Sequence, residues 1–521
     1  MAKGKPTTVT MKLAISRVSC QLMSMQSRGG RWGLDSALRP ILLAAVPKPI
    51  VGDPTVPFLR HPGLTLALLL SLATSPLQAQ TAPTSLDGVY ASPAQMSAEN
   101  RAALQAWLGK NRRDLGAPDA VAALAARLAP ARVVGIGEAT HGTHEDMVLK
   151  ADLILALVRE HGFRVVALES NRAVGERLQR FIAPGSAESD VGRALHESRI
   201  FEVYRVEALG RLLLGLQAFN RQAVEPVRVV GIDVQDPVRD GQAALAALRA
   251  RDAARADRLQ AALGTLVQGA PTSMPGPFAK ATRAEWEAWR DAASALEAAL
   301  PPELDPDGHE AAYALRMAIH TFEFNVQGAS MMDLPTEAFT RRDVAMAERT
   351  VRAAGRQGRV ALWAHDGHVA DHGYLLAGAA APTTGLALRQ RLQAGYQSVN
   401  FTYGAATFHA RRINAEGQME RGGAVPTWFR TMGPGSLDAA LVDGGDAAAA
   451  FWVDLAAMPR DERFAAWFRA TPFVRGGYGA AVMPPEMERA YESPDVLGYG
   501  VDVLVRLPTL SPSRFYAKPM P

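Results

Sequence analysis

The chain has 521 residues, of which 48% are hydrophobic and 21% charged, as in ordinary soluble globular proteins. Its formal net charge is +4, but residues 1–79 hold nine Lys or Arg and only two Asp, so the rest of the chain is net acidic. A mildly acidic body lacks the basic footprint of a nucleic-acid-binding protein, and we expect no nucleic acid partner.

An apolar run from Leu64 to Ala73 stands between Arg60 and the tripeptide that ends at Ala79. This layout predicts a secretory signal peptide cleaved after Ala79, because the run is too short to span a bilayer stably. The mature protein would then be periplasmic or secreted, without a membrane anchor. Since a signal peptide normally begins the chain, we interpret residues 1–55 as the product of an upstream start assignment. A disordered basic leader before a buried apolar segment is the alternative.

The only cysteine, Cys20, lies in this leader. The mature protein would therefore have no disulfide, no cysteine nucleophile and no thiolate metal ligand. We expect residues 80–96 to form a linker, 97–507 a catalytic domain and 508–521 a loose tail.

From about Ser92, short apolar runs alternate with amphipathic stretches, which is typical of an α/β protein. Four runs do not alternate cleanly, which predicts strands buried on both faces of a largely parallel sheet: RVVGIGE, RVVALES, VRVVGIDVQ and RVALWAHDGH. They end on Glu138, Glu169, Asp233 and His365. Because ligands bind outside the carboxyl ends of the strands in open α/β sheets, we predict one polar site there. Acids that merely cap the following helices would explain only part of this pattern.

The loop after the first strand leads into a predicted helix. Thr143 is expected to cap this helix, with Asp146 as the capping-box acid and Gly162 at its end. The glycines of VVGIG, Gly135 and Gly137, are expected to allow close packing or a turn of the backbone.

Five of the 11 histidines occupy two short stretches: His141 and His144, then His365, His368 and His372. A lone histidine is usually a surface or satisfied core residue. Two His-x-x-His pairs, each next to a strand end, favour a functional site.

Several catalytic motifs are missing from the sequence. There is no G-x-S-x-G, HEDMV lacks the second histidine of H-E-x-x-H, and there is no G-x-x-x-x-G-K-[ST]. Histidines and carboxylates without an evident nucleophile suit activation of water by a general base. A metal site of His, Asp and Glu would use the same residue types.

Residues 240–330 are predicted to be mostly helical, with apolar side chains at three- and four-residue spacing that would wall a cleft. Phe322, Phe324, Met331 and Met332 could contact an apolar substrate, although core packing is the favoured interpretation. The runs YQSVNFTYG, AAAAFWVDL and YGVDVLVRL predict further strands.

Five short stretches together resemble the erythromycin esterase family: GEATHGTHE, ALES, GIDVQ, RRDVAMAE and WAHDGHV. The resemblance extends from about Ser97 to Leu507. Members of this family hydrolyse the macrolactone ester of macrolide antibiotics, or are uncharacterised relatives of such enzymes. The resemblance implies an α/β fold of two related halves with helices on both faces of the sheet and a helical segment over a cleft. It also implies hydrolysis by activated water, without a covalent intermediate.

By this resemblance Glu138 matches an acid, His141 a general base and His365 the histidine of the second half. The predicted catalytic residues are Glu138, His141, Glu169 and His365. The predicted substrate-binding residues are His144, Lys150, Asp233, Arg342 and His368. His141 would take a proton from water, Glu138 or Glu169 would hold its ring, and a protonated His365 would stabilise the oxyanion. Lys150 and Arg342 could instead be ion-pair partners at the edge of the core.

Two positions depart from the family pattern. Asp366 stands where members often carry asparagine, and Asn171 where they often carry an acid. A carboxylate beside His365 is expected to raise the pKa of that histidine.

Three classes of function remain: a metal-independent carboxylic ester hydrolase with a small ester or lactone substrate and no cofactor, a metallohydrolase that uses the two His-x-x-His pairs with Asp233, and a non-enzymatic ligand binder. The sequence favours the first.

Overall fold

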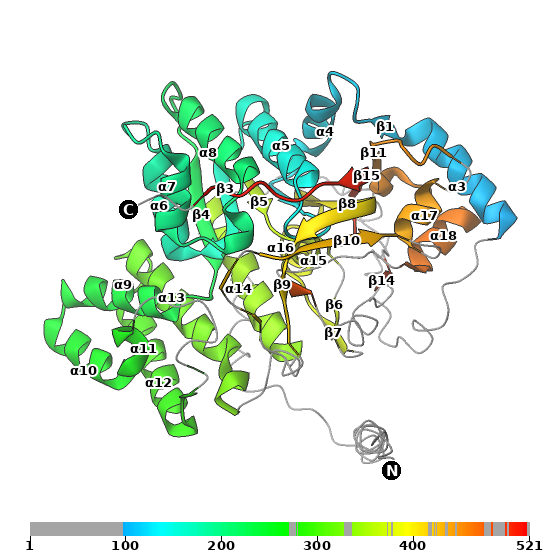
Figure 1. Cartoon of the computed structure of the whole chain (residues 1–521). Coiled ribbons are helices and arrows are strands. Elements are labelled where there is room, and N and C mark those ends of the chain that lie inside the picture. The colour runs from blue at the N-terminus through cyan, green and yellow to red at the C-terminus, as the bar shows by residue number, and fades with distance from the viewer. Residues whose placement is uncertain are drawn as a thin grey trace, which may run out of the picture. The chain divides into compact units, whose positions relative to one another are not determined.

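The computed structural model describes residues 97–269, 278, 280–327, 336–371, 374–376, 379–414, 419–420, 422–423, 425–432, 436–442, 445–473, 481–482, 495–496 and 500–517. The chain divides into two units, Met1–Ala79 and Gln80–Pro521. The first unit, with the predicted signal peptide, lies outside the described residues, as do Met331, Met332 and His372. The fold described is that of the second unit (Figure 1).

Within the described residues, nine strands form one sheet in the order β1-β11-β15-β8-β2-β5-β3-β4, and β10 pairs with β8. They are β1 (Arg113–Asp114), β2 (Val133–Ile136), β3 (Val165–Asn171), β4 (Arg228–Asp233), β5 (Val360–Trp363), β8 (Tyr396–His409), β10 (Thr427–Thr431), β11 (Phe451–Asp454) and β15 (Val503–Leu510). All neighbours from β15 to β4 are parallel, whereas β1, β10 and β11 pair antiparallel. The predicted largely parallel sheet is confirmed.

In the sheet, a strand from later in the chain lies between two strands from its earlier part. β5 lies between β2 and β3, and both of its pairings are parallel. The two halves that the resemblance implies would therefore share one sheet, and their relatedness stays a prediction. Three short strand pairs lie outside the sheet: β6 (Tyr374–Leu376) with β7 (Ala379–Ala381), β9 (Arg411–Arg412) with β13 (Ala481–Val482), and β12 (Pro472–Phe473) with β14 (Asp495–Val496).

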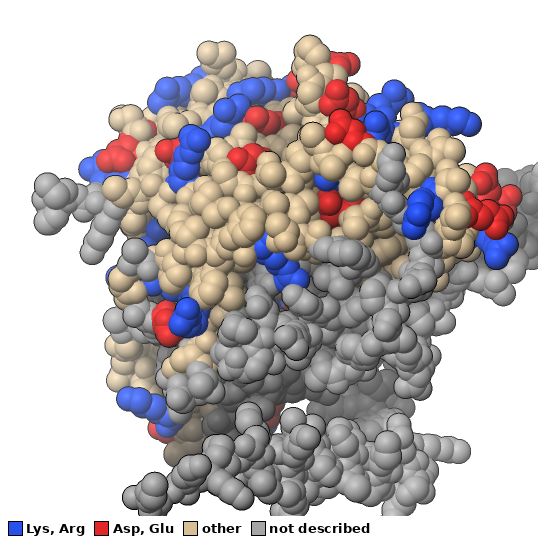
Figure 2. Space-filling view, turned by 45° about the vertical axis from the view of Figure 1, so that its right-hand side comes forward, with Lys and Arg blue, Asp and Glu red and all other residues tan. Residues whose placement is uncertain are grey.

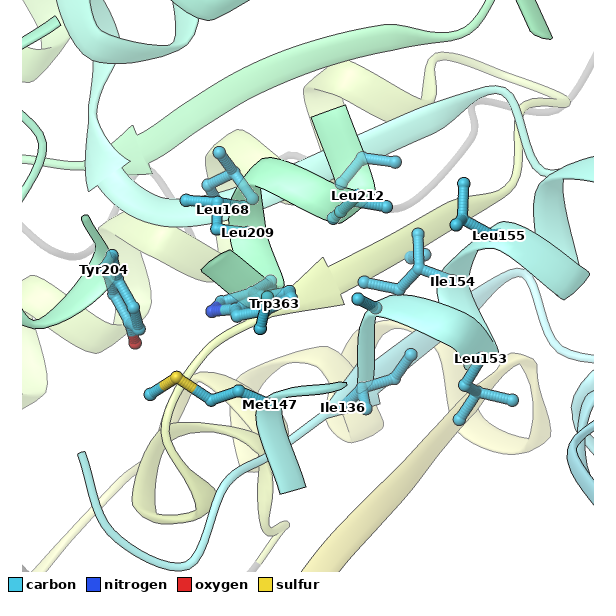
Figure 3. Packing of buried hydrophobic residues seen from close by; sticks show 14 of the residues in the cluster. Ile136, Met147, Leu153, Ile154, Leu155, Leu168, Tyr204, Leu209, Leu212 and Trp363 are labelled. Carbon is cyan, nitrogen blue, oxygen red and sulfur yellow. The ribbon is translucent and has the colours of Figure 1, made fainter. Parts of the chain in front are cut away.

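Helices cover both faces of the central strands, as expected from their apolar runs. Ile136 and Trp363 pack on one face (Figure 3), against α4 (Ala120–Leu128), α5 (Glu145–His161), α6 (Arg172–Ile182), α7 (Val191–Ser198) and α8 (Glu207–Asn220). Val133 of β2 and Leu362 of β5 pack on the other face against α14 (Thr336–Ala354) and α16 (Thr384–Leu392). Successive side chains of a strand point to opposite faces, so the continuous apolar runs fill two cores.

Helix α5 starts one residue later than predicted. Its N-cap is His144, without a side-chain cap, while Thr143 Oγ1 donates a hydrogen bond to Asp146 Oδ2 at 3.0 Å. The predicted capping box is therefore wrong, because the Thr143 hydroxyl serves a carboxylate instead of a backbone N–H. Gly162 ends the helix as predicted, with a φ of 71° that favours glycine.

The predicted helical region is confirmed as α9 (Pro237–Arg249), α10 (Ala253–Leu263), α11 (Thr265–Gln268), α12 (Arg283–Ala299) and α13 (Pro306–Thr321). These helices share a separate hydrophobic cluster that includes Phe322 and Phe324. Core packing was the favoured interpretation of these two aromatics, and they lie 6% exposed in that cluster. A further cluster joins α3 (Ala98–Asn111), α17 (Leu437–Val442) and α18 (Arg463–Ala470) to β11. No helix among the described residues is long and apolar enough to cross a membrane.

The end of the chain is not a loose tail as far as it is described. Pro508 continues strand β15, which ends at Leu510. Residues 511–516, called the C-terminal segment below, are joined by hydrogen bonds to the loop before α5 and to the start of α8. The prediction of a loose tail is wrong for these residues, because their backbone groups form hydrogen bonds with the folded domain.

Candidate active site

Four strands place their chemically capable residues at one edge of the sheet. Glu138 follows β2, Glu169 lies in β3, Asp233 ends β4 and His365 follows β5. These strands are adjacent and parallel in the order β2-β5-β3-β4, so their carboxyl ends meet. The hydrogen bonds described next join these side chains into one network, as the sequence pattern predicts.

Glu138 and His141 form a buried acid–histidine pair. His141 Nδ1 lies 2.7 Å from Glu138 Oε1, and Glu138 is completely buried. The Lys150 ammonium, also completely buried, contacts Glu138 Oε2 and donates to the Ala364 carbonyl at 2.8 Å. Burial opposes ionisation of Glu138, but Lys150 and the bond from His141 hold its pKa below the ordinary value. An ionised Glu138 accepts a hydrogen bond from Nδ1–H of His141, which leaves Nε2 as the basic nitrogen.

The backbone just before this pair packs closely against Asp366. A Cβ at Gly137 would lie 1.8 Å from Asp366 Oδ1. Only glycine allows so close an approach. The Asp366 carboxylate accepts a hydrogen bond from the Phe401 N–H at 2.9 Å. The carboxylate is thus turned toward β2 and β8.

His365 differs from the sequence expectation in its protonation. Burial and the neighbouring His141 lower the pKa of His365 to about 3, although Glu138 and Glu169 oppose this. The expectation that Asp366 would raise this pKa is wrong. Burial of the ring dominates, and the Asp366 carboxylate accepts a hydrogen bond from the Phe401 N–H instead. The Gly367 N–H lies 3.2 Å from His365 Nδ1, so the neutral ring carries its proton on Nε2. That nitrogen is buried and has no hydrogen-bond partner among the described residues.

The two rings stand side by side with complementary roles. The ring centroids of His141 and His365 are 4.9 Å apart, with an interplanar angle of 58°. His141 offers a lone pair on Nε2 and His365 offers an N–H on Nε2. His141 is 8% exposed. A base next to a neutral N–H donor is the arrangement that suits attack of water on a polarised carbonyl group.

Arg342 ties two strand ends together. Its guanidinium donates two hydrogen bonds to Asp233, at 2.9 and 2.8 Å, and one to Glu169 Oε1 at 2.9 Å. Two parallel hydrogen bonds to one carboxylate fix the orientation of the guanidinium as well as pairing its charge. Arg342 and the next residue, Asp343, both lie within α14.

His368 lies beside the same guanidinium. Its Nδ1 is 2.8 Å from Asp343 Oδ1, and its Nε2 is 3.2 Å from Glu169 Oε1 and 3.0 Å from Arg342 Nη1. Burial and Arg342 oppose a second proton on this ring, but Asp343 and Glu169 raise the pKa of His368 to about 10. In turn His368 and Arg342 hold the pKa of Glu169 well below its ordinary value despite burial.

Tyr204 is a member of the network that the sequence reasoning missed. It ends the short 3₁₀ helix η1 (Glu202–Tyr204), and its hydroxyl lies 2.8 Å from Glu138 Oε1 and 3.2 Å from Glu169 Oε2. No strand end or histidine motif marks its position, so the sequence carried no signal for it.

Two predicted positions lie apart from the network. His144 is half-buried at the start of α5, and its N–H donates to the Ser511 carbonyl at 2.9 Å. No hydrogen bond, ion pair or ring contact joins the His144 side chain to the cluster within the part of the chain that the structure describes. The Asn171 amide oxygen accepts from the Gln235 N–H at 2.8 Å, so it holds the loop after β4.

No group of three or more His, Cys, Asp or Glu side chains is arranged to hold a metal ion among the described residues. On the surface, Lys and Arg are interspersed with Asp and Glu across the described part of the face in Figure 2. The described part of that face carries no large area of a single charge.

The family model for erythromycin esterase matches residues 158–510, which is more than half of the chain. The chain belongs to the erythromycin esterase family. The match includes Glu169, Asp233, Arg342, His365 and His368, whereas the loop with Glu138 and His141 precedes it. The resemblance drawn from the five sequence stretches is confirmed.

Two curated members of the family are similar over a shorter region. Erythromycin esterase type I of Escherichia coli is 31% identical over 118 residues, which is 22% of this chain and 28% of that protein. Erythromycin esterase type II of Escherichia coli is 29% identical over 103 residues, 20% of this chain and 23% of that protein. The aligned region thus spans about a quarter of the length of the curated relatives.

Solved structures share the fold over most of this family member. A succinoglycan biosynthesis protein has a TM-score of 0.65 at 18% identity, covering 80% of this chain and 100% of that one. A Bacillus cereus protein has 0.63 at 20% identity, covering 80% and 98%. A mutant of the erythromycin esterase EreC in its open conformation has 0.57 at 18% identity, covering 76% and 95%. At these identities the likeness shows the fold alone.

Proposed function

We propose that the protein hydrolyses a carboxylic ester or lactone with a water molecule activated by His141, without a covalent intermediate. The observation that carries this proposal is the pair of complementary rings, whose centroids are 4.9 Å apart. One ring presents a basic nitrogen and the other a neutral N–H donor. Membership of the erythromycin esterase family supports the same reaction class.

In the proposed reaction, water attacks the carbonyl carbon while His141 Nε2 takes one of its protons. The carbonyl oxygen becomes an oxyanion that accepts a hydrogen bond from His365 Nε2–H. When the tetrahedral intermediate collapses, the bond to the alcohol oxygen breaks, and the His141 imidazolium returns its proton to that oxygen. The products are a carboxylic acid and an alcohol, joined in one molecule when the substrate is a lactone.

The remaining residues act through this pair. Glu138 keeps the proton of His141 on Nδ1 and stabilises the imidazolium that forms. We propose that Lys150 positions Glu138, because the Lys150 side chain is completely buried in contact with that carboxylate. Asp233 positions Arg342 in the same way, since Asp233 is also completely buried.

Glu169 fixes the loop that carries the oxyanion donor. Its Oε2 accepts the backbone N–H of His365 at 2.9 Å, while Arg342 and His368 hold its other oxygen. This contact fixes the backbone position from which the His365 side chain extends. We propose that Glu169, Arg342 and His368 form a supporting layer beneath the two reacting rings.

The substrate class follows from the relatives only as a proposal. The matched curated proteins are named erythromycin esterases, so macrolactones are the first lactones to test. We propose a screen of macrolides, smaller lactones and simple esters, with products identified by mass spectrometry. Opening of at least one substrate, with a mass gain of one water for a lactone, is the expected result. No turnover of any ester or lactone would favour a ligand-binding protein on the same scaffold.

Chelators should leave the activity intact. In the proposed reaction His141 and His365 supply the base and the oxyanion donor, so no step needs a metal ion. We expect equal rates before and after dialysis against a strong chelator, with metal content followed by elemental analysis. Stoichiometric zinc or manganese, together with loss of activity on its removal and recovery on its return, would instead support the metallohydrolase.

We also propose export of the protein, as the sequence layout before Ala79 predicts. N-terminal sequencing of protein recovered from the periplasm or medium should give Gln80 as the first residue, or a residue close to it. A mature product that retains residues 1–55 would contradict both the signal peptide and the proposed start.

A further inference from the structure

Tyr204 joins the two carboxylates that surround the proposed base. The side chain is 2% exposed, and its ring packs edge-on against His141, with centroids 5.3 Å apart, and against Trp363 at 6.2 Å. Figure 3 shows Tyr204 beside Trp363 in the core that covers this face of the sheet. Its hydroxyl thus reaches the polar network from an otherwise apolar cluster.

The Tyr204 hydroxyl has one proton to donate, and two carboxylates lie within hydrogen-bond distance of it. The nearer acceptor is Glu138 Oε1 at 2.8 Å, the same oxygen that accepts Nδ1 of His141 at 2.7 Å. Glu169 Oε2 lies at 3.2 Å. Tyr204 therefore competes with His141 for the negative charge of Glu138.

The charged groups around this hydroxyl come from several elements. Glu138 lies in the loop after β2, and Glu169 lies in β3. Lys150 of α5 contacts the other oxygen of Glu138, and Arg342 of α14 contacts the other oxygen of Glu169. Burial raises the pKa of Tyr204 well above its ordinary value, and the negative charges of Glu138 and Glu169 act in the same direction. The hydroxyl thus stays protonated and remains a donor.

The C-terminal segment fixes Tyr204 relative to His141. The residue after Tyr204, Arg205, accepts a hydrogen bond from the Tyr516 N–H at 2.9 Å, and the Glu207 N–H donates to the Arg514 carbonyl at 2.8 Å.

The same segment holds the loop that carries His141. The Ser513 N–H donates to the Gly142 carbonyl at 2.8 Å, and Ser513 Oγ donates to the Thr143 carbonyl at 2.7 Å. One stretch of chain thus ties the residue after His141 to the residue after Tyr204. The separation of the hydroxyl and the acid–histidine pair is therefore set by backbone hydrogen bonds.

We propose that Tyr204 is a positioning residue that places Glu138 and takes up part of the negative charge that Glu138 presents to His141. This inference rests on the proposed function for its catalytic consequence. Its electrostatic part concerns only the resting protein.

The test is Tyr204→Phe, which keeps the ring and removes the hydroxyl. Without that donor, the negative charges of Glu138 and Glu169 act more strongly on His141 and favour its protonated form. We expect the acid limb of the kcat/KM profile to move up by roughly half a pH unit to one unit. At the pH optimum kcat should fall on the order of tenfold, the factor for losing one hydrogen bond to a charged group, with KM nearly unchanged.

A second readout needs no substrate. NMR of protein labelled in the histidine rings follows the titration of His141 in the wild type and in Tyr204→Phe. The midpoint should rise by the same amount as the acid limb. If the wild type hydrolyses no ester, the proposed function fails, and the NMR midpoints still decide the electrostatic role of Tyr204.

Tyr396→Phe is the matched control. Tyr396 is also completely buried, and its hydroxyl donates to the Val369 carbonyl, not to a carboxylate of the site. This variant should lose stability without moving either midpoint. An unchanged midpoint in Tyr204→Phe, or an equal movement in Tyr396→Phe, would overturn the inference.

Discussion

Replacement of His141 by alanine should lower kcat about 10²–10⁴-fold, the usual contribution of a positioned proton transfer. The reason is geometric: Glu138 engages Nδ1 of His141 at 2.7 Å, so Nε2 is the nitrogen left to take a proton from water. Removing the ring removes the base. Steady-state rates on the best substrate of the screen would measure the loss, with far-ultraviolet circular dichroism to confirm an unchanged fold.

His161→Ala gives a matched control for this experiment. His161 is the last residue of α5, and the loop with His141 precedes the first residue of the same helix. The two variants therefore remove the same type of side chain, one from the loop before α5 and one from the last position of α5. We expect His161→Ala to retain nearly the rate of the wild type. A folded His141→Ala protein that is as active as this control would remove His141 from the mechanism.

Replacement of His365 by alanine should lower kcat about 10²–10³-fold, the cost of losing one oxyanion donor. The Nε2–H of His365 is buried without a hydrogen-bond partner among the described residues, so it can serve a developing charge. His365→Gln places an amide N–H at a similar distance from the backbone. The rates should therefore fall in the order wild type, His365→Gln, His365→Ala.

The pH dependence of this second effect tests the protonation state. Because burial and His141 lower the pKa of His365 to about 3, the ring is neutral throughout the range from pH 5 to pH 9. The ratio of wild-type to His365→Ala rates should then be constant across that range. A ratio that grows toward acidic pH would show that the imidazolium form of His365 stabilises the oxyanion, as the sequence first suggested.

Strand ends were the part of the site that the sequence could predict. Glu138, Glu169, Asp233 and His365 each follow or end an apolar run, and parallel pairing brings such positions to one edge. The same logic predicted both cores, since runs that are apolar on both faces must be covered on both faces. These features depend on local pattern and on one topological rule.

Contacts between distant segments could not be predicted in this way. Tyr204 lies in a short 3₁₀ helix between two longer helices, and only the folded chain shows that its hydroxyl reaches Glu138 and Glu169. Likewise, the partners of the C-terminal segment lie more than 300 positions earlier in the sequence. No local sequence pattern predicts such contacts between distant segments.

The protonation state of His365 also could not be predicted from the sequence. Asp366 is the neighbour of His365 in the chain, so it was expected to raise the pKa of that histidine. In the structure its carboxylate faces Phe401 and Gly137, and burial of the ring dominates. The direction of a pKa shift depends on where side chains point, which sequence adjacency does not specify.

Hydrolysis in water enriched in heavy oxygen tests the central claim most directly. Under single-turnover conditions, with enzyme in excess over a substrate found in the screen, water that attacks the carbonyl carbon directly places one heavy oxygen in the product acid. The account predicts that label in the acid, none in the alcohol, and no change in the mass of the enzyme. An acyl-enzyme adduct, or heavy oxygen in a carboxylate of the enzyme such as Glu138 or Glu169, would contradict it.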